Sequence, residues 1–228
     1  MHKYLVPISE SFSSNANDDY AFRMKKYMKD KFDYFGIKSP ERKILKKAFT
    51  DEYGFPELSE LDNIVKVCWQ LPQREFQYFI MEVLGRLAKK AGKERIELYE
   101  YLIENKSWWD TVDYIASNLV GVHFRLYHDL IIPFTRKWMN SGNMWLQRTA
   151  ILFQLKYRKD TDLLLLTDYI QQLQGSKEFF INKAIGWILR EYSKTDPDWV
   201  VRFIEKNELA NLSKREALKW MERKNIEN

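Results

Sequence analysis

Two heptapeptides that stand 35 positions apart decide the fold of this chain: MWLQRTA at 144–150 and FFINKAI at 179–185. Their apolar residues align with one another. Moving back by twice the same offset brings Leu146, Ala150, Ile151 and Phe153 onto apolar residues again, namely Phe76, Ile80, Met81 and Val83. A period of about 35 residues is typical of repeats made of helix pairs. The sequence therefore predicts a chain of stacked helical pairs.

The sequence around these heptapeptides is helical as well. The chain of 228 residues holds 8 Gly and 6 Pro, and between them apolar residues recur at spacings of three and four. Three stretches predict helix starts: Ser39–Pro40–Glu41, Ser59 with Asp62, and Thr195–Asp196–Pro197. We expect about a dozen helices. Such repeats stack into a curved solenoid with a concave inner face, and most such solenoids bind proteins.

Composition narrows the functional classes. Cys68 is the one cysteine and is accompanied by three histidines, so a disulfide is impossible and a zinc site is not expected. No Gly-rich phosphate loop or nucleophile–histidine arrangement is present, and His123 and His128, five residues apart, are expected on the surface. The chain has neither a secretory signal nor an apolar run long enough to span a membrane, so we expect a cytoplasmic protein.

Basic residues follow the repeat. Arg148 aligns with Lys183, and Lys156 is followed one repeat later by Arg190 and Lys194. The formal net charge is +5, which favours polyanions. A cation stripe that recurs once per repeat can neutralise successive phosphates of a duplex without reading its sequence. The alternative is a solvated basic face with no ligand.

The stretch SWWDTVD at 107–113 combines two tryptophans with two carboxylates. Ser107 is expected to cap a helix, with Asp110 completing a capping box, and Trp108 is expected to pack into the stack. These three residues are interpreted as structural.

Trp109 and Asp113 stand four residues apart and therefore share one helix face. An indole beside a carboxylate can stabilise a cation, and the carboxylate can orient a water. Trp187 follows Gly186, which we expect to remove bulk beside the ring, so two indoles could form the walls of a cleft around Asp113. The alternative is that Trp109 is a core residue and Asp113 pairs with a neighbouring Lys or Arg.

With these residues in place, the chain resembles the AlkD family of DNA glycosylases over nearly its whole length. The resemblance is carried by these segments in order: Lys26–Tyr27–Met28–Lys29, FGIKSPERK (35–43), LPQREFQ (71–77), SWWDTVD (107–113), NMWLQRTAILFQLKY (143–157), EFFINKAIGW (178–187), LREYSKT (189–195) and LSKREA (212–217).

The resemblance implies an all-α, HEAT-like solenoid of about six antiparallel helix pairs, a single domain over residues 1–228 whose basic concave face grips duplex DNA. It implies a monomer of the bacterial cytoplasm that hydrolyses the N-glycosidic bond of cationic lesions such as N3-methyladenine and N7-methylguanine. No metal or organic cofactor is implied. The target base is expected to stay in the duplex rather than flip into a pocket.

The resemblance also implies roles for single residues. Asp113 would position the water and stabilise the sugar cation, while Trp109 and Trp187 would contact the sugar and backbone at the lesion. The DNA contacts implied are Arg148, Tyr27, Lys156, Arg190 and Lys194. The alternative from another functional class is a non-catalytic helical-repeat scaffold that binds DNA or protein.

Overall fold

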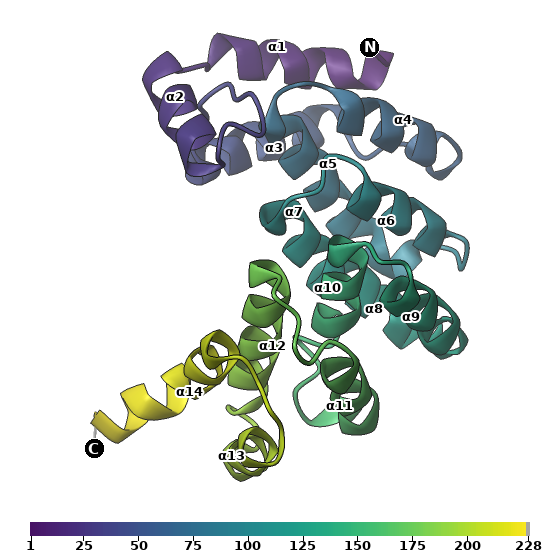
Figure 1. The fold of residues 1–228 in the computed structure, drawn as a ribbon. Helices are drawn as coiled ribbons and strands as arrows, with labels where there is room; N and C mark the ends of the chain where they lie inside the picture. Colours follow the sequence, from purple (N-terminus) through teal and green to yellow (C-terminus); the bar gives the residue numbers. More distant parts are fainter. Residues whose placement is uncertain (227–228) are drawn as a thin grey trace. The chain divides into compact units, whose positions relative to one another are not determined.

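The structure of the chain, a computed structural model, describes residues 1–226. Within these residues no strand forms, and Asp33 and Gln73 make an isolated bridge. The chain is all-α, and the predicted helical-repeat fold is confirmed (Figure 1). It divides into two compact units, of which the first is Met1–Leu87 and the second begins at Ala88.

The first unit is a set of short helices around an aromatic core. Its elements are η1 (Lys3–Leu5), α1 (Val6–Ser14), α2 (Asp18–Tyr27), α3 (Ser39–Tyr53), α4 (Leu58–Gln70) and α5 (Arg74–Leu87). Phe12 and Phe79 are fully buried and meet edge to face with ring centroids 6.3 Å apart. Phe79 makes the same kind of contact with Phe49 of α3 at 5.3 Å, so α1, α3 and α5 share one core.

A buried carboxylate holds the loop between α2 and α3. Glu75, in the first turn of α5, is fully buried and accepts hydrogen bonds from the backbone N–H groups of Phe35, Gly36 and Ile37 at 3.0–3.2 Å. Gly36 has φ +85°, and a Cβ there would lie 2.0 Å from the Asn17 carbonyl oxygen. Two of the segments that carried the resemblance, 35–43 and 71–77, therefore meet at Glu75.

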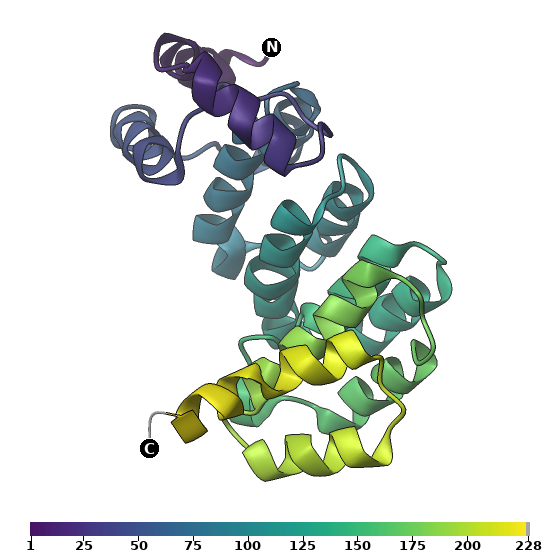
Figure 2. The same ribbon diagram turned by 60° about the vertical axis from the view of Figure 1, so that its left-hand side comes forward.

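The second unit carries the heptapeptide repeats. Its elements are η2 (Ala88–Lys90), α6 (Arg95–Glu104), α7 (Trp109–Tyr114), the π-helix η3 (Ile115–Val120), α8 (Gly121–Leu126), η4 (His128–Leu130), α9 (Ile131–Asn140), α10 (Met144–Leu152), η5 (Arg158–Asp160), α11 (Leu163–Gln172), α12 (Phe179–Tyr192), α13 (Pro197–Lys206) and α14 (Asn211–Ile226). The heptapeptides 144–150 and 179–185 begin α10 and α12, as their alignment predicts. Helix α10 contacts α7 and α12, and α12 contacts α14 (Figures 1 and 2).

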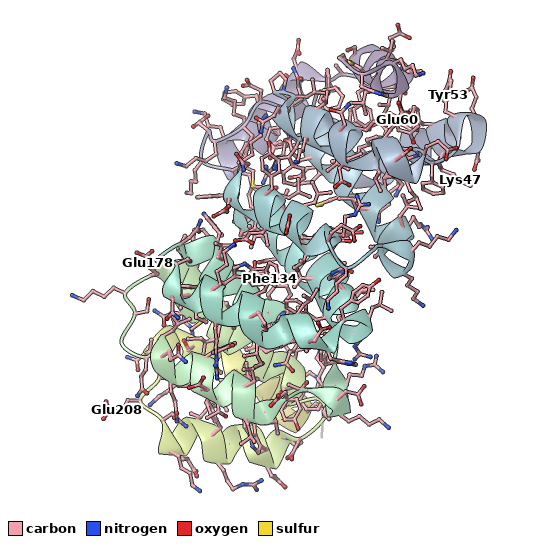
Figure 3. All side chains as sticks on the ribbon, turned by 90° about the vertical axis from the view of Figure 1, so that its right-hand side faces the viewer. Lys47, Tyr53, Glu60, Phe134, Glu178 and Glu208 are labelled. Atoms are coloured by element: carbon pink, nitrogen blue, oxygen red, sulfur yellow. The ribbon has the colours of Figure 1, made fainter. Side chains whose placement is uncertain are left out.

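Large side chains fill the second unit between its helices. Trp138 is fully buried and stacks on Phe124 with centroids 5.8 Å apart, while Phe134 of the same helix α9 meets Trp138 at 5.9 Å. Figure 3 draws these side chains and labels Phe134. Burying several rings of this size gives the unit an apolar core of its own. No helix in the described part of the chain is both long and apolar enough to cross a membrane.

The predicted helix start is right for α13, whereas the N-caps of α3 and α4 lie one and two residues before the predicted ones. Asp196 caps α13, since its side chain accepts a hydrogen bond of 2.8 Å from the N–H of Trp199. Helix α3 already includes Ser39, and Lys38 is its N-cap. Helix α4 begins at Leu58, before Ser59. The capping roles predicted for Ser39 and Ser59 are therefore wrong.

His123 is a further correction, because it is fully buried rather than on the surface. Its ring meets Tyr99 edge to face at 5.6 Å, and its Nε2 lies 3.1 Å from the Lys93 carbonyl oxygen. The π-helix Ile115–Val120 immediately precedes α8 and has more residues per turn than an α-helix. Side chains after it are rotated relative to a count that assumes 3.6 residues per turn.

Candidate functional site

Helix α7 brings two of the predicted residues into the second unit, but it begins differently from the expectation. Trp108 is its N-cap and makes no side-chain capping bond. Ser107 instead donates its hydroxyl to the Ile103 carbonyl oxygen at 2.6 Å, which satisfies the end of α6. The capping box predicted for Ser107 and Asp110 is therefore wrong. Asp110 still lies in the first turn, where its negative charge interacts favourably with the positive end of the helix dipole.

Asp113, near the end of α7, pairs with Arg148 of α10 in a two-pronged geometry. Arg148 Nε donates to Oδ1 at 2.7 Å and Nη2 donates to Oδ2 at 2.9 Å. The Arg148 side chain is 5% exposed and that of Asp113 is 14% exposed. The pair spans one repeat of 35 residues. A two-pronged pair between ionised groups fixes the plane of the carboxylate as well as its position.

Arg148 also reaches the first turn of α12. Its Nη1 donates to the carbonyl oxygen of Phe180. One guanidinium therefore ties together α7, α10 and α12. Three of its five N–H groups are used in these bonds, which leaves two donors for another acceptor. The helices that carry Trp109, Asp113 and Trp187 are thus linked through the Arg148 side chain.

Three aromatic rings at the starts of α7, α10 and α12 form a cluster. Trp108 lies 5.6 Å from Trp145 and 5.2 Å from Phe180, and Trp145 lies 5.0 Å from Phe180, all between ring centroids. Packing of Trp108 into the stack is thereby confirmed. The Phe180 ring lies 6.0 Å from the Arg148 guanidinium carbon, and an apolar ring at that distance strengthens the electrostatics of the Asp113–Arg148 pair by lowering the local dielectric.

The carboxyl of Asp113 has a perturbed acidity. Burial raises its pKa above the ordinary value of an aspartate, and the hydrogen bond and charge of Arg148 oppose that rise. The Arg148 side chain therefore favours the ionised form of this carboxyl. Perturbed carboxyl groups of this kind are common at catalytic sites.

The two tryptophans expected beside Asp113 are both partly exposed, Trp109 at the start of α7 and Trp187 in α12. A cleft between their rings stays a prediction. Gly186 does not make room beside Trp187: a Cβ there would lie 2.5 Å from the Cβ of Glu216 and 2.8 Å from the Ser213 carbonyl oxygen. Because Gly186 has no side chain, α14 can pack closely against α12. The expectation that Gly186 makes room beside the Trp187 ring is therefore wrong.

Two of the predicted cations line one pocket. Lys156 and Lys194 border a pocket of about 780 Å³ at the ends of α10 and α12, together with three further cations, Arg125, Arg158 and Lys159. Asp160 and Glu191 add two negative charges. Lys194 pairs with Glu191 at 2.6 Å, and Lys156 donates to the Asn118 side chain at 2.6 Å. Cations exceed carboxylates in the lining, so the pocket suits phosphate.

Arg190 and Lys183 of α12 both pair with Glu216 of α14, at 3.2 and 3.0 Å. Both cations belong to the predicted basic stripe, whereas the carboxylate between them was not predicted. A glutamate within the matched segment 212–217 was the available signal.

Tyr27 belongs to the first unit, where it ends α2 and is 70% exposed. Phe22 of the same helix is 63% exposed and lies under the ammonium of Lys26 at 5.7 Å. Exposed aromatics among cations are suited to stacking and phosphate contacts. In the part of the chain that the structure describes, no three His, Cys, Asp or Glu side chains gather as metal ligands would.

Comparison with known proteins gives one consistent result. Residues 8–221 match the model of a family described as DNA alkylation repair enzyme. The fold matches a solved structure from Enterococcus faecalis, described as a predicted DNA alkylation repair enzyme, with a TM-score of 0.83 and 31% sequence identity over 90% of this chain and 96% of that one. None of the curated proteins matches the chain.

Proposed function

Because the chain belongs to the family of DNA alkylation repair enzymes, we propose that it is a DNA glycosylase of base excision repair. Its proposed substrates are cationic alkylated purines, N3-methyladenine and N7-methylguanine, in duplex DNA. The observation that carries the proposal is Asp113: a carboxylate that Arg148 orients through two hydrogen bonds and that keeps 14% of its side chain exposed.

The charge of the substrate determines which catalytic groups the protein must supply. An alkylated purine carries a positive charge, so the C1′–N bond can break with its electron pair returning to the base, and the base leaves neutral. No general acid is needed. What remains is a sugar with oxocarbenium character and a water that must attack C1′.

Asp113 can serve both remaining needs. Its negative charge stabilises the sugar cation, and one of its oxygens accepts the proton that the attacking water loses, leaving an abasic site and the free base. Arg148 keeps the carboxylate ionised against burial and offers its two remaining donors to a phosphate. Trp109, one turn before Asp113, and Trp187 on α12 would flank the sugar.

The duplex would be held by cations that read no sequence. Lys156 and Lys194 support this role because they line the basic pocket, and Arg190 because its side chain is 30% exposed. Tyr27 is proposed as the aromatic contact of the first unit. We propose that a monomer suffices, that the lesion stays stacked, and that no cofactor takes part.

A second candidate is a non-catalytic repair-family scaffold that binds DNA. The observation that favours it is the Asp113–Arg148 pair itself, since an ion pair of this geometry can be purely structural. The two candidates differ in whether base is released.

The experiment is incubation with methylated duplex DNA and quantification of free N7-methylguanine and N3-methyladenine by mass spectrometry. We expect release by the natural chain, at least about 100-fold less by Asp113→Asn, and none from uracil-containing duplex. Asp168→Asn is the matched control, because Asp168 is an exposed aspartate on α11. Binding without release by the natural chain would establish the scaffold instead.

A further inference from the structure

Helix α12 places two cations and an indole on one face. Lys183, Trp187 and Arg190 are spaced by four and then three residues, so they lie in a row along the helix. Trp187 is therefore preceded and followed, one turn away, by a positive charge.

Both flanking cations end on the same carboxylate. Glu216 of α14 accepts Lys183 on Oε1 at 3.0 Å and Arg190 on Oε2 at 3.2 Å. The Glu216 side chain is 5% exposed, whereas those of Lys183 and Arg190 are 35% and 30% exposed. The carboxylate is hidden and the cations are open to a ligand.

The contact between the two helices is built at this level. Gly186, next to Trp187, lets the Cβ of Glu216 and the backbone of Ser213 approach α12. Helices α12 and α14 pack against one another (Figures 1 and 2). The Ser213 hydroxyl donates to the Asn182 carbonyl oxygen at 2.9 Å. Glu216 is thereby held at a fixed height beside Trp187.

The cluster retains positive charge. Lys219 is a third cation on Glu216, so one carboxylate faces three cations. Burial acts to raise the pKa of Glu216, but the hydrogen bonds from Lys219 and Lys183 outweigh it and hold the pKa below the ordinary value. Glu216 thus stays ionised while leaving excess positive charge for an anion.

We propose that Glu216 is a positioning residue of the DNA-binding face: it fixes Lys183 and Arg190 on the two sides of Trp187, so that α12 presents an indole between two phosphate-binding cations. The partner is the sugar–phosphate backbone of a duplex. The inference rests on the proposed function for its partner, and Glu216 itself does not touch the DNA.

The test is Glu216→Gln, which keeps the size of the side chain and removes its charge. Affinity for undamaged duplex is measured by fluorescence anisotropy over a range of salt concentrations. We expect binding about tenfold weaker and a log–log salt slope shallower by about one, because a misplaced cation no longer contacts its phosphate. Glu222→Gln, on an exposed position of the same helix, is the matched control and should leave the slope unchanged.

The sign of the effect separates positioning from simple charge. Deleting a negative charge should tighten binding and steepen the slope if Glu216 merely repels DNA, so tighter or unchanged binding overturns the proposal.

If Glu216→Gln melts below the assay temperature, Glu216→Asp replaces it. Its shorter side chain cannot span both cations, so we expect binding about threefold weaker by the same reasoning, and natural affinity in that variant overturns the proposal. Base release by the natural chain, measured in parallel, reports separately on the proposed function.

Discussion

Glu75 of the first unit and Asp113 of the second are both carboxylates whose pKa is raised by burial, yet their partners differ. Glu75 is fully buried and accepts three backbone N–H groups that are fixed by the loop 35–37. Asp113 is paired with one side chain from another helix and keeps an exposed edge. Backbone donors are fixed by the fold, so a ligand cannot replace them. A side-chain partner can be replaced, and a partly exposed carboxylate can be reached by a ligand. A perturbed pKa alone therefore does not identify a functional carboxylate.

The largest expected effect is that of Arg148→Ala, which leaves Asp113 buried without its partner. Removing one member of a buried pair is expected to lower the free energy of unfolding by about 3 kcal/mol. Chemical denaturation monitored by circular dichroism measures this. Arg125→Ala is the control, because Arg125 pairs with Asp160 at an exposed site and should cost less than about 1 kcal/mol. Equal losses in the two variants would contradict the assigned strength of the Asp113–Arg148 pair.

Glu75→Gln should have the next largest effect on stability. The amide retains one acceptor oxygen but places a donor against backbone N–H groups, so we expect a loss of about 2 kcal/mol in the free energy of unfolding. The same denaturation experiment measures it. Glu82→Gln, on the same helix with side-chain partners, is a useful comparison. An unchanged free energy of unfolding in Glu75→Gln would contradict the structural role assigned to Glu75.

The pH dependence of base release sharpens the contrast further. Asp113 must be ionised to act, and its pKa is raised, so activity should be present at high pH and lost as the pH falls through a midpoint above the ordinary aspartate value of about 3.9. In Arg148→Ala the midpoint should move to still higher pH, since the opposing positive charge is gone. Single-turnover rates, corrected for spontaneous depurination, give the profile. A midpoint that stays in place in the variant would show that another group controls the rate.

The smallest expected effect concerns His123, a buried group outside the site. Burial lowers its pKa, so the unfolded chain takes up the proton first as the pH falls below about 6.5, and stability is lost toward acid. His123→Gln should flatten this decline in the unfolding free energy between roughly pH 7 and 5. Thermal denaturation at stepped pH measures it, with His128→Gln, at an exposed position, as control. An equal decline of the unfolding free energy toward acid in both variants would show that a group other than His123 takes up the proton.

The repeat in the sequence predicts the helices well, because apolar alignment at an offset of 35 reports directly which faces are buried. The pairing of Asp113 with Arg148 follows the same offset and agrees with the alternative that Asp113 pairs with a neighbouring Lys or Arg, but the spacing of cations does not show which of them the carboxylate takes. Glu216 was missed for the same reason.

Local rules failed where tertiary contacts competed with them. Ser107 stands at the boundary of two helices, and its hydroxyl closes α6 rather than opening α7. His123 follows a π-helix that no residue count anticipates. Gly186 makes room for α14, a contact that lies outside its own helix.

The central claim, that Asp113 is the functional carboxylate and Glu75 a structural one, is tested most directly by single-turnover release of N7-methylguanine from duplex DNA by Asp113→Asn and Glu75→Gln. Both are assayed at saturating protein and at a temperature where both are folded. We predict that Asp113→Asn lowers the rate at least about 100-fold with DNA binding retained, while Glu75→Gln keeps the natural rate. Natural activity in Asp113→Asn would contradict the account.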